Sequence, residues 1–581
     1  MDPFIFFREP VLVSHKQYEA LRMYFIEDIP AHEVADRYGY TYRAFTSLVS
    51  VFRIKLADDP SGSFFFVENK PGRKVSSDTM DSRSVIIDMR KKYYSVPDIK
   101  VALDALGLFV SEKNIYNILA SEGFSRLPRR SKLIKQQLEP VKIEADTAIP
   151  LAFEPEVFKS ANAGMLMFLS IIKRYRIDEV INKSGYPSTS QINKMSSILS
   201  FLALKLSNRR RYSSDDTWCM DRGMGLFAGL NVLPKTAWYT SYSDRVTSEM
   251  NRGFLKQLHR VWEKEGLLED TSNLDFTTIP YWGDDRHLEN NWSGKRGKAL
   301  SSMLAVLAQD PDTGLIDYAD ANVLQKEESA VVLEFLDFYR SEKDRKEDQL
   351  RYIVFDSKFT NYENLDKLDQ QHIKFITIRR RGKQMLERIA NLPNKGWKQV
   401  RVPCAGNKHR TLRIYDEIVF LNGYNKEIRQ ITITGHGKIK PAVIITNDME
   451  LTVEKVIRKY ARRWIVEKTI SEQIEFFHLN LVSSSMVIKV DFDLTMSILA
   501  YNLYRLLARE LQRYENLSVQ RLYEKFVLNG ADITINEKNI IVQLRKKRSL
   551  PSILESMTAF KRQKYSWLKN KKVIFEGASY M

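Results

Sequence analysis

The feature that most constrains the fold is an alternation of strand-like and helix-like segments across residues 273–380. Apolar and β-branched runs at 273–283, 299–309 and 315–323 read as strands, and the turn DPDTG joins the last two. A helical pattern at 326–344, a strand at 351–357, a second helical segment at 360–371 and a strand at 372–380 follow. This order predicts an α/β sheet with mixed strand directions.

The same order suits a ribonuclease H-like fold, in which acidic side chains from the first strand and from the strand after the first helix meet a carboxylate on a later helix. Asp275 and Asp356 occupy those two strand positions. Asp356 ends the apolar run YIVFD, where a buried carboxylate is costly unless a cation pairs with it. Either aspartate alone is equally well explained as a turn residue at a strand end.

The third carboxylate is Glu467, in the segment YARRWIVEKTISEQIEFFHL at 460–479. The segment lacks Gly and Pro and predicts one long helix, with Tyr460, Arg463 and Glu467 on one face. A carboxylate beside phosphate-binding groups suits a metal-dependent enzyme that acts on a phosphodiester backbone. The alternative is a surface helix with an ordinary Arg–Glu pair four residues apart.

The N-terminal region contains two groups of three short helical patterns. The first, at 15–53, is typical of a helix-turn-helix whose third helix presents Arg43 to a DNA major groove. The second, at 82–125, runs into a basic extension that includes Arg129 and Arg130, suited to contacts with phosphates or a minor groove. A plain three-helix packing unit is the alternative reading of such a pattern.

The charge balance also favours nucleic acid. The 581 residues include 90 Lys and Arg against 72 Asp and Glu, a net charge of +18, which indicates a polyanionic partner. No apolar run approaches the roughly 18 residues that span a bilayer, and the first residues lack the pattern of a signal peptide. We therefore expect a cytoplasmic, nucleoid-associated protein without a membrane partner. Cys219 and Cys404 lack companions at ligand spacing, so neither a disulfide nor a zinc site is expected.

Residues 379–449 exceed what a connection to the 460–479 helix needs. Four alternating segments there predict a small antiparallel β insertion. Arg379, Arg380 and Arg381 begin it and border the predicted site, and Trp397 lies among further basic residues that could grip DNA. Aromatic residues in such strands usually pack across the sheet instead.

These patterns predict a multidomain α+β chain, with helix-turn-helix units, a helical middle domain and a ribonuclease H-like α/β domain interrupted by the β insertion. The expected divisions are a helix-turn-helix domain (1–57), a linker (58–80), a second helix-turn-helix domain with its basic extension (81–135), a linker (136–157), a helical scaffold or dimerisation domain (158–270), the two parts of the ribonuclease H-like domain (271–378 and 450–513) around the insertion (379–449), and a basic C-terminal region (514–581).

The residues LDFTT around Asp275, YIVFDS around Asp356, IITND before the last helix and the Tyr-x2-Arg-x3-Glu spacing resemble the DDE transposases of bacterial insertion sequences. The resemblance is to the group with a β-strand insertion between the second Asp and the Glu, and it covers roughly residues 270–510. In that group a Lys usually stands six residues after the Glu. Ile474 stands at that position here, so this chain lacks the lysine that would contact a phosphate.

The resemblance implies cut-and-paste transposition, with DNA strand cleavage and strand transfer at the terminal inverted repeats of an insertion sequence. Asp275, Asp356 and Glu467 would hold two Mg²⁺ ions, for which Mn²⁺ can substitute. Tyr460 and Arg463 would fix a phosphate, and Trp397 would stack on an unpaired base. The partners implied are double-stranded DNA, as transposon ends and target, and a second copy of the chain in a homodimer.

Two other functions are compatible with the sequence. One is a non-catalytic DNA-binding regulator derived from a transposase, which the tandem N-terminal units and Ile474 favour. The other is a structure-selective nuclease of the same fold.

Overall fold

The computed structural model describes residues 10, 13–58, 82–91, 94–124, 151, 153–210, 215–280, 289–293, 298–340, 349–404, 408–437, 440–479 and 487–578. The chain divides into two compact units, Met1–Met80 and Asp81–Met581. Each unit is described by itself below.

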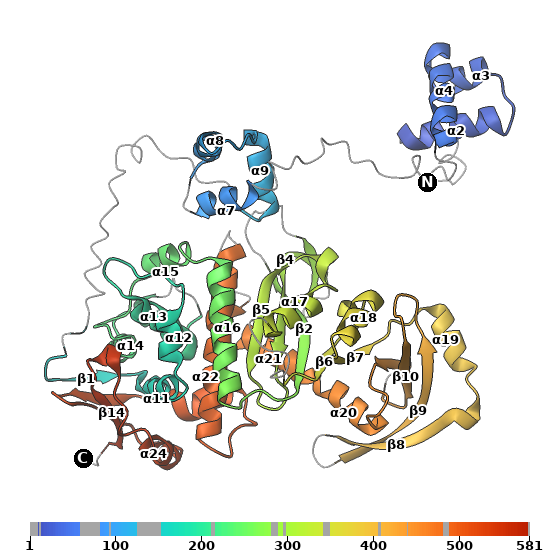
Figure 1. Ribbon diagram of the computed structural model, residues 1–581. Coiled ribbons are helices and arrows are strands. Elements are labelled where there is room, and N and C mark those ends of the chain that lie inside the picture. Colours follow the sequence, from blue (N-terminus) through green and yellow to red (C-terminus); the bar gives the residue numbers. More distant parts are fainter. Residues whose placement is uncertain are drawn as a thin grey trace. The chain divides into compact units, whose positions relative to one another are not determined.

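The first unit contains the three predicted helices, α2 (Val13–Phe25), α3 (Ala31–Arg37) and α4 (Tyr42–Asp58) (Figure 1). Each helix contributes apolar side chains to one small core, because its apolar residues recur at helical spacing. The core comprises Ala20, Leu21, Met23, Val34, Ala35, Tyr38, Phe45 and Val49.

The second predicted triplet also forms, as α7 (Arg83–Lys91), α8 (Val96–Ala105) and α9 (Glu112–Ser121). The hydroxyl of Ser111 caps α9 by accepting a hydrogen bond from the Asn114 N–H at 3.3 Å. Gly123, with a φ of +79°, takes a left-handed conformation just after the helix. A separate apolar cluster holds the three helices together, formed by Ile86, Ile99, Leu103, Val110, Ile115, Ile118 and Leu119.

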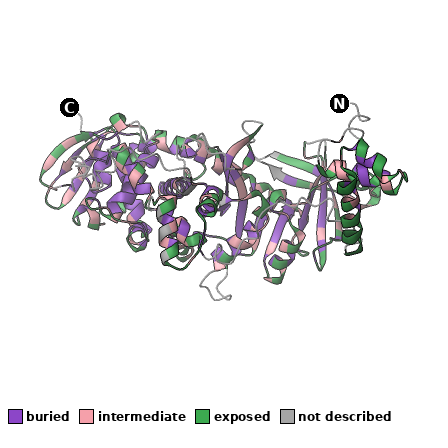
Figure 2. Cartoon of the chain, turned by 90° about the horizontal axis from the view of Figure 1, so that it is seen from above, coloured by how far each residue is buried: buried purple, intermediate pink, exposed green. Residues whose placement is uncertain are grey.

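The middle of the chain is helical, as predicted. Its helices are α11 (Met167–Arg174), α12 (Ile177–Lys183), α13 (Lys194–Leu206), α14 (Arg222–Phe227), α15 (Thr236–Ser243) and α16 (Ser248–Lys264). They pack around α22 (Val487–Glu510), which is buried along almost its whole described length. Buried residues, purple in Figure 2, continue from these helices into the adjoining sheet, so the two share one hydrophobic core.

The strands predicted after residue 270 belong to one large mixed sheet, and the predicted helices connect them. The strands of its first half are β2 (Thr271–Pro280), β3 (Asn290–Ser293), β4 (Lys298–Gln309), β5 (Ile316–Val323), β6 (Tyr352–Phe355) and β7 (Lys374–Ile378). β4 lies antiparallel between β2 and β5, and β2, β6 and β7 run parallel. Helices α17 (Val331–Arg340) and α18 (Tyr362–Gln370) make the connections on either side of β6.

The segment predicted as a β insertion extends this sheet. Its strands β8 (Trp397–Cys404), β9 (Lys408–Phe420), β10 (Glu427–Thr434) and β11 (Ala442–Thr446) are antiparallel, and β11 pairs with β7. The four predicted strands are present, and they continue the large sheet because β11 completes the edge of β7. Helix α19 (Lys383–Ala390), which precedes β8, was not predicted.

The C-terminal region forms a second sheet with a strand from before the helical middle. Its order is β1 (Glu156–Ser160), β12 (Ala531–Ile535), β13 (Asn539–Leu544) and β14 (Lys572–Gly577). Helix α24 (Leu550–Thr558) connects the parallel strands β13 and β14. Residues 156–157, predicted as linker, belong to β1, because five backbone positions of β12 pair with it.

Candidate active site

Two neighbouring parallel strands place the predicted aspartates side by side. β2 and β6 pair in a register that sets Leu274 opposite Phe355, so the next residues, Asp275 and Asp356, are adjacent across the sheet. Neighbouring strands lie about 4.8 Å apart. The structure thus brings together two carboxylates that are 81 positions apart in the sequence.

Local hydrogen bonds orient both carboxylates. Asp275 Oδ1 accepts from the Phe276 N–H at 2.8 Å, and Asp356 Oδ1 accepts from the Ser357 N–H at 2.7 Å. The ring of Phe276 stacks on Phe359 with centroids 4.0 Å apart and planes within 7° of parallel. This stacking joins the two strand ends behind the carboxylates.

One guanidinium connects the strands to the helix that carries Glu467. Arg463 Nη1 lies 2.9 Å from Asp275 Oδ2, and Arg463 Nη2 lies 2.6 Å from Glu467 Oε1. Its guanidinium also lies 5.6 Å from the centre of the Tyr460 ring. The side chain of Arg463 is only 6% exposed, so its guanidinium is shielded from solvent, whereas the side chain of Glu467 is 38% exposed.

The carboxylates of Asp356 and Glu467 both act on Asp275. Burial raises the pKa of Asp275 to about 6; Arg463 opposes this rise, whereas Glu467 and Asp356 add to it. Burial alone would lower the pKa of the Arg463 guanidinium, but the surrounding carboxylates, Asp275 first, raise it above its ordinary value. Burial also raises the pKa of Tyr460 to about 12. Tyr460 therefore stays a neutral hydroxyl at physiological pH.

The helix predicted across 460–479 is broken at Arg463. α20 (Val453–Arg462) and α21 (Trp464–Glu475) flank this residue, and the Val466 N–H donates to the Arg463 carbonyl at 3.0 Å, a spacing of three residues instead of four. The Arg462 carbonyl accepts from the side-chain amide of Asn273 at 3.1 Å. The prediction of one continuous helix is wrong because a side chain inserts into the helical hydrogen-bond ladder at this point.

Asn273 was not among the predicted site residues. It is fully buried on β2, two residues before Asp275 and therefore on the same face of the strand. A polar amide inside an apolar strand was the signal available in the sequence. Lys459 and Arg462 add to this attachment of α20: Lys459 Nζ donates to Thr271 Oγ1 at 2.6 Å, and Arg462 Nη2 donates to the Pro311 carbonyl at 2.7 Å.

A cavity of about 1190 Å³ opens beside these groups. Asp356, Tyr460, Arg463 and Glu467 lie on its wall, together with Arg381. Strands of the extended sheet and α20 supply an apolar lining, made by Ile378, Val402, Leu412, Ile433, Ala442, Ile444 and Ile457. The cavity therefore combines acidic and basic groups with an apolar surface.

The other predicted DNA-binding residues of this region are spread more widely. Arg379 Nη1 donates to Gln430 Oε1 at 2.6 Å, and Arg380 Nε donates to the Ser357 carbonyl at 3.3 Å, next to Asp356. Trp397 does not line the cavity. Its ring lies 5.6 Å from Tyr415 and 4.9 Å from the Arg413 guanidinium, an arrangement of cross-strand packing.

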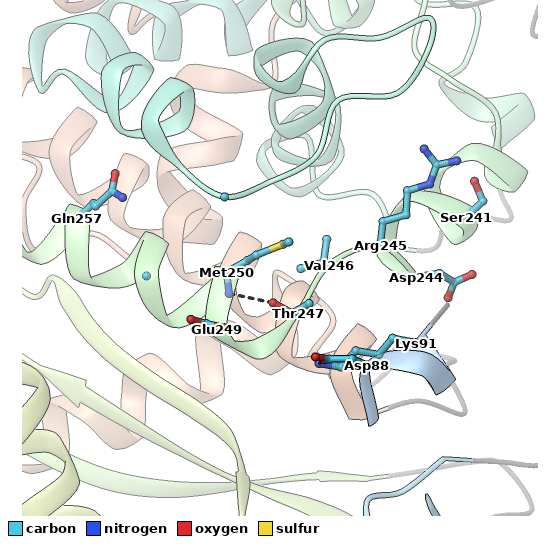
Figure 3. Close-up of a pocket in the computed structure, with 12 residues that line it drawn as sticks. Asp88, Lys91, Ser241, Asp244, Arg245, Val246, Thr247, Glu249, Met250 and Gln257 are labelled. Atoms are coloured by element: carbon cyan, nitrogen blue, oxygen red, sulfur yellow. Dashed lines mark hydrogen bonds and ion pairs between the residues drawn. The ribbon is translucent and has the colours of Figure 1, made fainter. Parts of the chain in front are cut away.

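Arg43 is exposed on α4 of the first unit. Arg129 and Arg130 lie outside the described residues. A second cavity, beside the N-terminus of α16, contains none of the predicted site residues (Figure 3). There the Thr247 hydroxyl accepts from the Met250 N–H at 3.2 Å and caps the helix.

The chemistry of the carboxylates fits a divalent cation, since carboxylate oxygens are the ligands that Mg²⁺ and Mn²⁺ prefer. Within the described ranges, however, no three acidic, His or Cys side chains stand close enough together to hold a metal ion as they are. Arg463 explains this arrangement, because its guanidinium lies between Asp275 and Glu467. A cation would take over the positive charge that Arg463 now supplies.

No helix among the described residues is long and apolar enough to cross a membrane.

A comparison with known protein families concerns the same part of the chain. Residues 269–503 match the family model described as transposase DDE domain, and this segment includes Asp275, Asp356, Arg463 and Glu467. No curated protein matches the chain significantly. A solved structure of piggyBac transposase, in a synaptic complex with hairpin DNA, is 11% identical and aligns over 64% of this chain and 82% of its own, with a TM-score of 0.35.

Proposed function

We propose that this chain is a DDE transposase of an insertion sequence, which binds the terminal inverted repeats and catalyses DNA strand cleavage and strand transfer. The match of residues 269–503 to the transposase DDE domain supports a transposase. The strand order β5-β4-β2-β6-β7, with β2, β6 and β7 parallel, supports a ribonuclease H-like arrangement of this segment.

The observation that carries the proposal is that Arg463 bridges Asp275 and Glu467, while Asp356 follows the strand beside that of Asp275. These residues come from two strands and a later helix, and each lies within the matched segment. A surface Arg–Glu pair, the alternative for the helix alone, would be exposed and would not include a strand aspartate. The 6% exposure of Arg463 argues against that alternative.

The surroundings of each residue of the site support a specific role in this reaction. Asp275, Asp356 and Glu467 would hold two Mg²⁺ ions, which activate a water or a 3′ hydroxyl and stabilise the leaving oxygen when bound. Arg463, once released from a carboxylate, presents two N–H groups suited to one phosphate. Tyr460 offers a neutral hydroxyl as a donor to the same phosphate. Arg380 and Arg381 border the site and supply further positive charge.

We further propose that α4, which carries Arg43, and α9 are recognition helices of two helix-turn-helix units that bind the transposon ends. Their helical triplets each have an apolar core of their own, which suits independent reading heads. Two ends must be joined in one assembly, so a homodimer on DNA belongs to this proposal. The domain divisions predicted from the sequence belong to it as well.

A non-catalytic DNA-binding regulator is the second candidate. Two observations favour it: Ile474 replaces the usual Lys, and Arg463 already neutralises two of the three carboxylates. A regulator of this kind would bind the ends and leave the DNA intact under every metal condition.

The test uses purified full-length chain and linear DNA that contains the gene with its flanking sequence. With Mg²⁺ or Mn²⁺, we expect cuts at the borders of an inverted repeat. Asp356→Asn keeps the size of the side chain and should bind the same DNA without cutting it. Asp366→Asn, on α18, is the matched control and should still cut. Cutting by Asp356→Asn would refute the assignment, and binding without cutting by the natural sequence would favour the regulator.

A further inference from the structure

Two basic segments that are far apart in the sequence are connected through the residues at the end of β1, and the first of them lies beside His478, just after α21. The first is Asn208–Arg209–Arg210, which follows α13. Asn208 Oδ1 lies 2.7 Å from His478 Nε2, three residues beyond α21, and both residues have left-handed backbones, with φ of +55° and +56°. Such conformations are unfavourable for residues other than Gly, so surrounding contacts must hold them in place.

The second segment is Arg545–Lys546–Lys547–Arg548, which follows β13. The Arg545 N–H donates to the Gly530 carbonyl at 2.9 Å, at the end of the sheet where β1 reaches Ser160. Arg209 Nη2 donates to Asn162 Oδ1 at 3.0 Å, just beyond the same strand end. Residues 160–162 therefore connect the two basic segments.

Four of the six cations in these segments are exposed. Arg210, Arg545, Lys546 and Arg548 are all exposed. Over the residues that the structure describes, the guanidinium groups of Arg210, Arg545 and Arg548 form neither a hydrogen bond nor an ion pair. Elsewhere on the surface, exposed guanidinium groups do pair with carboxylates, as Arg176 pairs with Glu179 at 2.7 Å. Neither basic segment contains an acidic residue of its own.

We propose that Arg210, Arg545, Lys546 and Arg548 form a cationic edge that binds the phosphate backbone of DNA leaving the site at Glu467. The proposal rests on the proposed function for the position of the DNA. Glu467 and the end of α21 at Glu475 are eight residues apart, about 12 Å at 1.5 Å per residue. This length is about a third of a turn of duplex DNA, which carries a phosphate charge every 1.7 Å or so.

The opposite end of the same small sheet provides a matched control. Lys561, Arg562 and Lys564 are also exposed cations, and they precede Tyr565, which pairs with Lys571 beside the start of β14. Two triple variants therefore remove the same charge from near the two ends of this sheet. They are Arg210→Gln/Arg545→Gln/Arg548→Gln and Lys561→Gln/Arg562→Gln/Lys564→Gln.

The experiment measures binding of each full-length variant to a 40-base-pair duplex of arbitrary sequence over a range of salt concentrations. The plot of log affinity against log salt should lose about 2 to 3 units of slope in the first variant, since each phosphate contact contributes about 0.9. At about 0.1 M salt this corresponds to a loss of affinity on the order of 100-fold. The control variant should change the slope by less than about one unit, and Lys in place of the three arginines should restore it.

An equal loss of slope in both triple variants, or no loss of slope in the first, would overturn the proposal of a cationic edge. Should the first triple variant fail to fold, the single changes Arg210→Gln, Arg545→Gln and Arg548→Gln give the same test with about one third of the effect each. The readout is binding, so it is independent of cleavage. If the chain never cuts DNA but shows the predicted slopes, the proposed transposase is wrong and the cationic edge stands. If it cuts DNA but the slopes do not change as predicted, the transposase stands and the cationic edge is wrong.

Discussion

The side-chain amide of Asn273 donates a hydrogen bond to the backbone carbonyl of Arg462 at 3.1 Å, across 189 positions of the chain. This bond lies where the hydrogen-bond ladder between α20 and α21 is interrupted, one residue before Arg463. Asn273 is therefore a positioning residue, which acts on the carboxylates through the helix break and the guanidinium that follows it.

Replacing Asn273 by Leu should weaken DNA cleavage about 10- to 100-fold and leave binding of the DNA nearly unchanged. The isosteric side chain removes the donor and leaves the buried Arg462 carbonyl unsatisfied, at a cost of about 1–3 kcal/mol. Arg463→Gln and the double variant complete the comparison of cleavage rates. Because both residues act through one guanidinium, the double variant should be no worse than Arg463→Gln. Fully additive losses would mean that Asn273 has only a general structural role.

Removal of the guanidinium between the carboxylates should strengthen the binding of a divalent cation. Arg463→Met takes away the charge that neutralises Asp275 and Glu467, so Mn²⁺ should bind at least several-fold more tightly, as measured by electron paramagnetic resonance of the free ion. Cleavage should fall at the same time, because the phosphate loses its bidentate partner. Arg462→Met, which removes a neighbouring cation that bonds Pro311, is the control and should leave Mn²⁺ affinity unchanged. Weaker Mn²⁺ binding by Arg463→Met would contradict the competition.

The buried carboxyl of Asp491 should make stability fall as pH rises. Burial raises its pKa to about 7 from an ordinary 3.8, and Asn251 Nδ2 donates to it at 2.6 Å. A raised folded pKa means that the folded chain holds a proton which the unfolded chain has lost, so this contribution is complete below about pH 4 and is lost by about pH 7. Asp491→Asn keeps the neutral form at every pH, and should therefore melt at a higher temperature than the natural chain at pH 8.

The difference between the two chains should shrink towards pH 4. It is expected to reach a few kcal/mol at pH 8, at about 1.4 kcal/mol per unit of pKa shift. Melting curves at pH 5, 6, 7 and 8 measure it. A constant difference over this range would show that Asp491 does not titrate as its burial predicts.

The buried ion pair of Lys205 with Asp493 should be far more sensitive to the loss of one partner than of both. The two charged atoms lie 2.8 Å apart, and the side chains are 8% and 7% exposed. Lys205→Met leaves Asp493 buried with an uncompensated charge, which costs about 3–5 kcal/mol. Lys205→Met/Asp493→Leu removes that charge and should recover most of the loss in melting temperature. A double variant as unstable as the single one would instead assign the loss to the bond from Lys205 to the Phe477 carbonyl.

Much of the local structure was predictable from the order of residues. Apolar periodicity indicated both N-terminal helical triplets and, with small errors at their ends, the strands β2, β4, β5, β6 and β7. The spacing of Tyr460, Arg463 and Glu467 correctly indicated that they meet on one side of the helical segment. Each of these predictions depends on neighbours within one or two turns, where the geometry of a helix or strand is the same in any protein.

The contacts that organise the site were beyond such reasoning. A continuous helix was predicted across Arg463, yet a side chain from β2 interrupts it, and a strand predicted within the β insertion completes the edge of β7. Residues 156–157, read as linker, pair with β12 from near the other end of the chain. Sequence periodicity thus determined which segments form helices and strands. Only the tertiary structure decided which backbone groups they present to one another, because a carbonyl or an open strand edge accepts any suitably placed donor and leaves no mark in the local pattern.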